Sequence, residues 1–121
     1  MVKAMFDTNI LIDYLRGIPA ARDELTCFET KAISLITWME VLVGTPPQHV
    51  RATQAFLDGF TRIAIDRSVA ERAVTLRQTH RLKLPDAIVW ASAQVHGMLL
   101  VTRDTKSFPT GDPGVRVPST V

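Results

Sequence analysis

Four of the twelve acidic residues lie beside apolar segments, where a carboxylate is expensive to bury. They are Asp7 after MVKAMF, Glu40 inside ISLITWMEVLVG, Asp86 in LPDAIVWASA, and Asp104 shortly after the apolar stretch MLLV. A buried charge is tolerated only when it is paired, hydrogen-bonded or bound to metal. These apolar segments offer no obvious buried Lys or Arg, so four converging carboxylates would repel one another unless a cation joined them.

The donor types indicate which cation such a cluster would hold. Carboxylate oxygens suit the hard ions Mg²⁺ and Mn²⁺, which keep several waters and are held through a few carboxylates. The three histidines (His49, His80 and His96) and the single Cys27 show no spacing typical of a zinc site. Mg²⁺ or Mn²⁺ can orient a water and neutralise charge on a phosphodiester, so the pattern indicates phosphodiester hydrolysis.

Each acid also has an ordinary structural explanation. Asp7 could cap the helix that follows it. Glu40 stands three residues after Thr37, which matches a capping box. Asp86 suits the first turn of a helix, and Asp104 suits a turn. A binding module whose acids only cap helices and turns therefore stays open as an alternative.

The elements that must position these acids alternate between short strands and helices, which predicts an α/β fold with a mostly parallel sheet. The expected strands cover residues 3–6, 32–35, 61–65, 98–101 and 115–117, and the expected helices cover 10–15, 19–29, 36–43, 49–58, 68–80 and 85–96. The fifth helix would face inward with Val69, Ala73 and Leu76, and the sixth with a stripe at 84, 88, 91 and 95. Because the carboxyl ends of parallel strands gather at one edge, three of the acids can converge there, and Glu40 joins if its helix packs across that edge.

Composition predicts one domain over residues 1–121. The net charge is only +2, although residues 51–83 carry seven basic and three acidic side chains. The single Cys27 and the lack of a long apolar stretch in MVKAMFDTN favour a cytoplasmic location, and no run approaches transmembrane length.

Four segments, FDTNILIDYL, ISLITWMEVLVG, LKLPDAIVWASAQVHG and LVTRDTKSF, resemble the signature segments of PIN-domain ribonucleases, specifically VapC-type toxins of bacterial toxin–antitoxin pairs. The resemblance implies a three-layer α/β/α PIN-like fold and RNA hydrolysis with Mg²⁺ or Mn²⁺ at Asp7, Glu40, Asp86 and Asp104. It also implies supporting roles for Asn9 and Thr102. The implied partners are an RNA substrate, a second copy in a homodimer, and a VapB-like antitoxin through which operator DNA is bound.

One departure concerns the last segment. Many relatives carry Asn at the position of Asp104 and an aspartate at that of Ser107. Either Asp104 is the fourth ligand directly, or the metal rests mainly on Asp7, Glu40 and Asp86, with Asp104 and Ser107 acting through water.

Residues around the acids suggest how partners would bind. Arg16, Arg103 and Lys106 are candidate RNA contacts. Tyr14, Trp38, Trp90 and Phe108 could stack on bases, although core positions are expected for both tryptophans. The first two helices, with Leu11, Leu15 and Leu25, could offer an apolar groove. A housekeeping nuclease of the same fold, acting in RNA maturation or decay without an antitoxin, is the second alternative.

Overall fold

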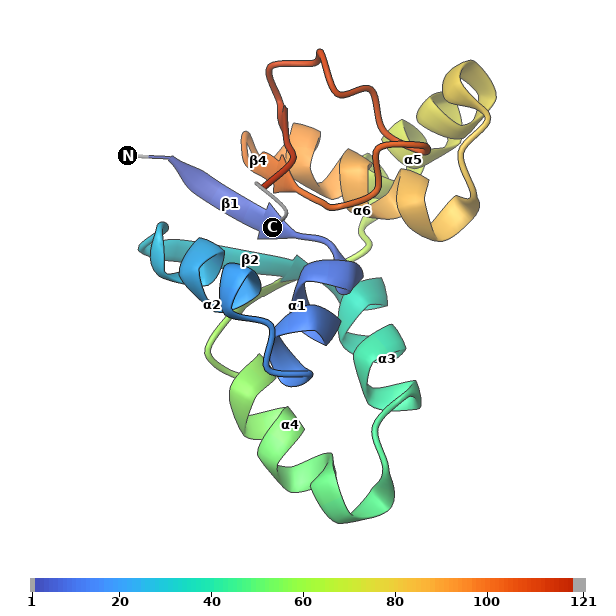
Figure 1. The fold of residues 1–121 in the computed structure, drawn as a ribbon. Helices are drawn as coiled ribbons and strands as arrows, with labels where there is room; N and C mark the ends of the chain where they lie inside the picture. Colours follow the sequence, from blue (N-terminus) through green and yellow to red (C-terminus); the bar gives the residue numbers. More distant parts are fainter. Residues whose placement is uncertain (1, 119–121) are drawn as a thin grey trace.

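One parallel sheet forms the centre of the molecule, for which a computed structural model describes residues 2–118 (Figure 1). Its strand order is β3-β2-β1-β4-β5, and every neighbouring pair is parallel. The strands are β1 (Lys3–Phe6), β2 (Thr30–Ser34), β3 (Thr61–Ile63), β4 (Leu99–Val101) and β5 (Val115–Arg116). The first strand of the chain is therefore central, paired with β2 on one side and β4 on the other.

Helices connect the strands and cover both faces of the sheet. They are α1 (Thr8–Leu15), α2 (Pro19–Thr26), α3 (Leu35–Val43), a 3₁₀ turn η1 (Pro47–His49), α4 (Val50–Leu57), α5 (Arg67–His80) and α6 (Leu84–Val95). Gly17, which follows α1, has φ +80°, a conformation that glycine adopts without a steric penalty. This turn allows α2 to start at Pro19 and pack back against α1.

Two apolar clusters, one on each face of the sheet, make the fold three-layered. Met5, Ala32 and Leu100 pack with the buried faces of α5 and α6. Phe6 and Ile33, which directly follow Met5 and Ala32, pack on the opposite face with α1, α2 and α4. This alternation is the period of a strand buried on both faces. The predicted three-layer α/β/α fold with a parallel sheet is confirmed.

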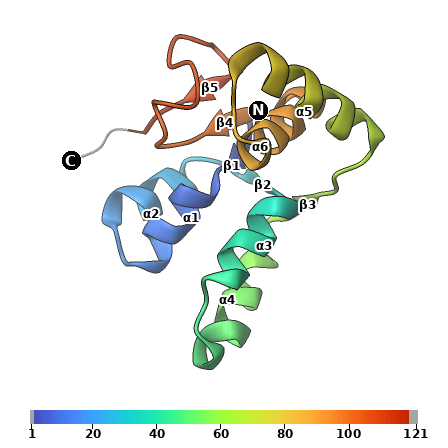
Figure 2. The same cartoon turned by 90° about the vertical axis from the view of Figure 1, so that its right-hand side faces the viewer.

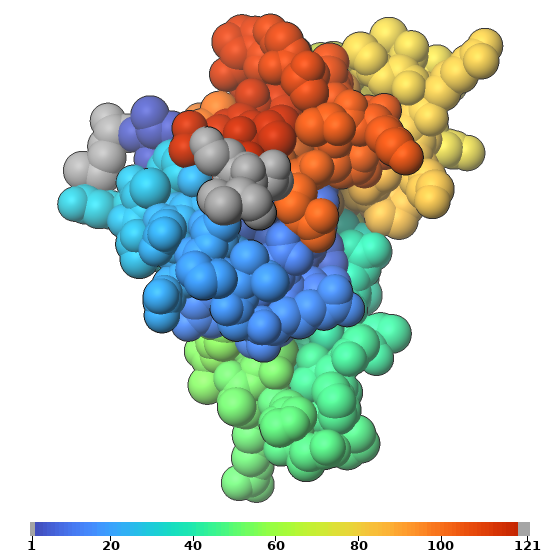
Figure 3. Space-filling model, in the orientation of Figure 1, coloured from blue at the N-terminus to red at the C-terminus, as the bar shows by residue number. Residues whose placement is uncertain are grey.

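The helices α3 and α4 lie side by side and extend beyond the sheet, as Figure 2 shows in teal and green. On the face drawn in Figure 3, the segment after β4, in orange and red, lies against the blue α1 and α2. Two ion pairs join these segments, Arg103 to Asp13 of α1 and Arg116 to Glu24 of α2. No helix formed by residues 2–118 has the length and apolar character needed to cross a membrane.

The sixth helix faces the core with a side that only partly matches the predicted one. Leu84 and Val95 are exposed, whereas Ala87, Trp90 and Ala91 are buried and Ile88 packs against the core. The predicted stripe at 84, 88, 91 and 95 is therefore correct in its middle and wrong at both ends, and small alanines allow this helix to pack closely on α5 and the sheet. The predicted inward residues of α5, namely Val69, Ala73 and Leu76, are buried.

Element ends differ from the predictions by one to three residues. The second helix ends at Thr26 rather than near Glu29, and β3 ends at Ile63 rather than Ile65. The strand β2 runs from Thr30 to Ser34, and Ser34, which still pairs with Ile63 of β3, also caps α3. Only this last difference affects the site.

Candidate active site

The order in which strands are added to the sheet reverses between β1 and β4, which makes this the topological switch point. From β1 the chain adds β2 and β3 on one side, and it then returns to add β4 and β5 on the other. In open parallel sheets, ligands bind outside the carboxyl ends of the strands at such a switch point. Asp7 directly follows β1 and Thr102 directly follows β4, so both stand at that point.

Asp7 is buried, with 5% of its surface exposed, and it is held by three donors. Its Oδ1 accepts the Thr8 backbone N–H at 2.8 Å, which makes Asp7 the N-cap of α1. Its Oδ2 accepts the Thr102 hydroxyl at 2.8 Å and the Asn9 side-chain amide at 3.3 Å. The expected support from Asn9 and Thr102 is therefore present as direct contacts, and the carboxylate both caps a helix and stands at the switch point.

Burial raises the pKa of Asp7 from 3.8 to about 6, because a desolvated carboxylate is harder to ionise. Hydrogen bonds from Thr102 and Thr8 lower the pKa, but they do not compensate for burial. The charges of Asp86 and Glu40 raise it further. A simple helix cap would gain from being charged, so this carboxylate carries a cost that capping does not explain.

Glu40 does not form the capping box that its sequence context allows. The N-cap of α3 is Ser34, whose hydroxyl accepts the Ile36 N–H, so Thr37 lies inside the helix. The exposed Glu40 instead accepts the Thr8 hydroxyl at 2.7 Å through Oε1. The glutamate is thus attached to the first residue of α1, beside Asp7.

Asp86 of α6 and Asp104 of the segment after β4 complete the acidic group. Asp86 lies in the first turn of α6, where burial and the charges of Asp104 and Glu40 raise its pKa, while Lys83 lowers it. Burial alone would raise the pKa of Asp104, but hydrogen bonds from Ser107 and the Lys106 backbone outweigh it and hold that pKa below its ordinary value. Ser107 therefore supports Asp104, whose Oδ1 accepts the backbone N–H groups of residues 106 and 107 at 3.0 Å each.

The four carboxylates influence one another electrostatically, and their chemistry fits Mg²⁺ or Mn²⁺. The charges of Asp86 and Glu40 raise the pKa of Asp7, and the charges of Asp104 and Glu40 raise the pKa of Asp86. Yet within residues 2–118 no three His, Cys, Asp or Glu side chains stand close enough to ligate one ion directly. Mg²⁺ commonly binds through one or two carboxylates and several waters, so the oxygen-only donor set suits it without a tight cage.

Two lysines lie near the acids, whereas Arg103, a predicted RNA contact, is paired with a carboxylate elsewhere. Lys83, the N-cap residue of α6, acts on Asp86, and Lys106 acts on Asp104. Arg103 instead forms a bidentate pair with Asp13, with N–O distances of 2.7 and 3.1 Å. Sequence reasoning missed Thr8 and Lys83, although Thr8 directly follows Asp7 and Lys83 precedes Asp86 by three residues, and this closeness in sequence was the available signal.

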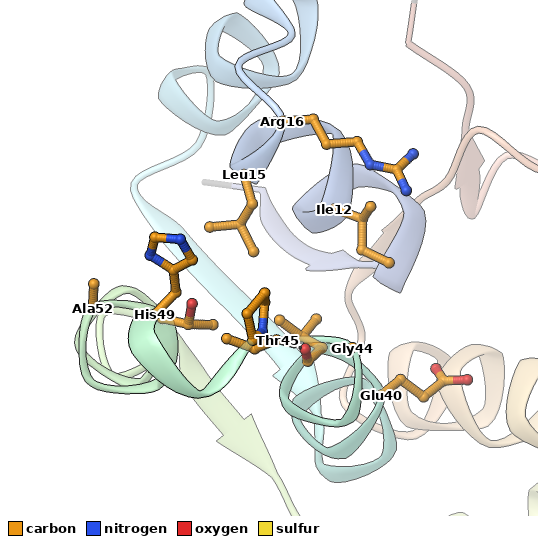
Figure 4. A pocket seen from close by; sticks show the side chains of 11 residues that line it. Ile12, Leu15, Arg16, Glu40, Gly44, Thr45, His49 and Ala52 are labelled. Carbon is orange, nitrogen blue, oxygen red and sulfur yellow. Dashed lines mark hydrogen bonds between the residues drawn. The ribbon is translucent and has the colours of Figure 1, made fainter.

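A groove of about 500 Å³ runs between α1, α3, η1 and α4 and ends at Glu40 (Figure 4). Ile12 and Leu15 line it from α1, Arg16 lies at its rim, and His49 lines it from η1. The predicted groove on the first two helices is corrected by this arrangement: Leu11 and Leu25 are buried in the core. Only Leu15 of the predicted residues faces the groove, because α2 packs its apolar side on the sheet.

The aromatic candidates mostly belong to the core. Trp90 and Phe108 are buried and pack edge to face, with ring centroids 5.9 Å apart. Trp38 is half-buried under the Arg62 guanidinium, and Tyr14 stacks on Phe56. The core position expected for Trp90 is confirmed, while Trp38 is only partly covered.

Comparisons with known proteins agree with this geometry. The PIN domain family matches residues 4–110. Ribonuclease VapC10 of Mycobacterium tuberculosis is 30% identical over 113 residues, covering 87% of this chain and 85% of that protein. A tRNA(fMet)-specific endonuclease VapC of Shigella flexneri is 28% identical over 120 residues, covering 89% and 91%. A chain in a toxin–antitoxin complex from Klebsiella pneumoniae is 49% identical, with a TM-score of 0.92 over 98% of this chain and 100% of that one. The chain therefore belongs to the PIN-domain family and resembles its VapC-type members.

Proposed function

We propose that this chain is an endoribonuclease that requires Mg²⁺ or Mn²⁺ and acts as the toxin of a toxin–antitoxin pair. The observation that carries the proposal is the buried Asp7 at the switch point, whose pKa is raised by burial and by the charges of Asp86 and Glu40. A protein keeps such a costly carboxylate where it serves a function. Membership of the PIN family and similarity to proteins named ribonuclease and endonuclease support RNA as the substrate.

The residues at the site have two proposed roles: some would bind the ion, and others orient those that bind it. Asp7, Glu40, Asp86 and Asp104 would supply the carboxylate oxygens, directly or through water. When bound, Mg²⁺ or Mn²⁺ supplies positive charge to a phosphodiester oxygen and lowers the pKa of a water. Thr102 and Asn9 orient Asp7 by donating to its Oδ2. Ser107 and the Lys106 backbone N–H orient Asp104, so in this proposal Ser107 supports Asp104 rather than replacing it.

RNA must approach this acidic edge against charge repulsion, and basic side chains around it offset that cost. Lys83 and Lys106 are exposed and lie nearest the acids, and Arg16 lies at the groove rim. We therefore propose these three as phosphate contacts. Arg103 contributes mainly by joining the loop after β4 to α1 through Asp13.

A VapB-like antitoxin is the proposed protein partner, since the 49% identical relative comes from a toxin–antitoxin complex. The groove that ends at Glu40 would place an antitoxin segment beside the acids. In this proposal the antitoxin, and not this chain, binds operator DNA. A homodimer is also proposed, and the exposed Met39, Val43 and Leu84 of α3 and α6 offer apolar surface for it. Light scattering on the purified chain tests the dimer.

The test of function is a Mn²⁺ titration of the purified chain, followed by calorimetry and by cleavage of total cellular RNA and of initiator tRNA. Wild type is expected to bind Mn²⁺ and cut discrete RNAs, whereas Asp7→Asn and Asp86→Asn fold but do neither. Asp58→Asn, which removes an exposed carboxylate at the end of α4, is the matched control and should behave as wild type. A wild-type chain that neither binds Mn²⁺ nor cuts RNA would leave a non-catalytic module as the better description.

A further inference from the structure

Thr8 touches two of the four acids with two different groups. Its backbone N–H donates to Asp7 Oδ1 at 2.8 Å, and its hydroxyl donates to Glu40 Oε1 at 2.7 Å. The two carboxylates come from different elements, one from the end of β1 and the other from α3. One residue at the start of α1 therefore fixes the spacing between them.

The Thr8 hydroxyl has two neighbours but only one hydrogen, so its donor and acceptor roles can be assigned. Thr8 Oγ1 also lies 3.3 Å from the hydroxyl of the buried Thr37, which stands one turn before Glu40 on α3. A hydroxyl carries one hydrogen, and a charged acceptor at 2.7 Å binds it more strongly than a neutral one at 3.3 Å. The Thr37 hydroxyl is then free to donate to the Thr8 oxygen, and the two hydroxyls form a short chain that ends on the carboxylate.

Glu40 needs such support more than the other acids do. It is exposed and reaches the site from a helix that extends beyond the sheet, whereas Asp7 is buried and held by three donors. A long, exposed carboxylate samples several rotamers unless a hydrogen bond selects one. The Thr8 hydroxyl selects the rotamer that brings Glu40 Oε1 to the first residue of α1.

We propose that Thr8 is a positioning residue that holds Glu40 at a fixed place relative to Asp7 and thereby sets the affinity of the site for divalent metal. This inference rests on the proposed function, because it assumes that the acids bind Mg²⁺ or Mn²⁺. Partners that orient metal ligands typically change metal affinity by roughly 10-fold to 100-fold when they are removed. The hydroxyl of Thr8 is expected to fall at the lower end, since a water can replace it at an exposed carboxylate.

The test measures Mn²⁺ binding by calorimetry in the absence of RNA. Thr8→Val, which keeps the shape but removes the hydroxyl, is expected to weaken binding about 10-fold. Thr8→Ser should restore affinity to within about twofold of wild type. Thr8→Ala removes the same hydroxyl without adding a methyl group, so it replaces the valine variant if that one does not fold. Thr79→Val is the matched control, because its hydroxyl donates only to a carbonyl within α5.

A second measurement separates positioning from general structural damage. In a Glu40→Gln background, Thr8→Val should have almost no further effect on Mn²⁺ affinity, because the group it positions is already altered. Raising the Mn²⁺ concentration should restore RNA cleavage by Thr8→Val nearly to the wild-type maximum.

Three results would overturn the inference, and they can be told apart. If wild type and Thr8→Val bind Mn²⁺ equally, Thr8 has no positioning role and the proposed function still stands. If the effects of Thr8→Val and Glu40→Gln add, the loss is structural and unrelated to Glu40. If wild type does not bind Mn²⁺ at all, the proposed metal dependence fails together with this inference.

Discussion

Replacing Asp7 by Asn in the metal-free protein should reveal how much the buried carboxylate costs the fold. Burial raises the pKa of this group from 3.8 to about 6. At 1.36 kcal/mol per pH unit, that rise corresponds to about 3 kcal/mol. Asn accepts the Thr8 N–H as an N-cap nearly as well as Asp does, so the helix cap is kept while the charge is removed.

The sign follows from where the proton is bound. Below pH 3.8 the carboxyl is protonated in both the folded and unfolded chains, and above about pH 6 it is ionised in both. Between these values the folded chain binds more protons than the unfolded chain, so the free energy of unfolding falls as pH rises. The Asn variant has no such proton, and its stability relative to wild type should therefore improve by up to about 3 kcal/mol between pH 4 and pH 7.5.

Urea unfolding in EDTA at the two pH values measures this difference. Comparing the two pH values cancels the free-energy contribution of any hydrogen bond that Asn loses to Thr102 or Asn9, because that contribution is the same at both. Asp66→Asn is the matched control, since it also changes a helix-capping carboxylate, but at the exposed start of α5. If the advantage of Asp7→Asn over wild type is the same at pH 4 and pH 7.5, burial does not raise the pKa of Asp7, and the reasoning about its cost is refuted.

Three further predictions concern the metal, an ion pair and a turn. Mn²⁺ affinity, measured by calorimetry, should fall as pH drops below about 6, because a proton then competes for Asp7; a flat profile from pH 7 to 5 would contradict this. Glu24→Gln should lower the free energy of unfolding by about 2 kcal/mol, since Arg116 loses its charged partner in a pair that is only partly exposed; restoration by Arg116→Gln in a double-mutant cycle checks the coupling. Gly17→Ala should cost about 1 kcal/mol in the same urea assay, because φ +80° strains any residue with a Cβ; an unchanged midpoint would mean that the turn relaxes freely.

The sequence was sufficient to predict the layers of the fold, because these depend on local patterns, whereas the shared role of the four acids stays a prediction. Apolar runs such as the one ending at Phe6 and the helix stops at Gly17 and Gly44 mark the alternation of strands and helices. The placement of Asp7 follows from the rule that strand ends gather at one edge of a parallel sheet. Three of the ordinary explanations were also correct, since Asp7 does cap α1, Asp86 does stand in the first turn of α6, and Asp104 does accept backbone N–H groups in the turn that follows it.

What the sequence did not predict depends on contacts between distant segments. The capping box at Thr37 and Glu40 fits the sequence motif, but Ser34 caps α3 three residues earlier and leaves Glu40 to bind Thr8 of another helix. The buried side of α6 is set by its packing on α5, and the pairing of Arg103 with Asp13 joins residues 90 positions apart. Periodicity within one helix carries no information about such partners.

The hydrogen bond from Thr102 to Asp7 joins residues 95 positions apart along the chain, and this has a consequence for synthesis. Asp7 is translated more than 90 residues before β4, which completes the strand pairing around it. A nascent chain therefore cannot assemble the acidic edge while β4 is still inside the exit tunnel. If the proposed function holds, RNA cleavage begins only after β4 has joined the sheet, because Asp7 lacks its Thr102 partner until then.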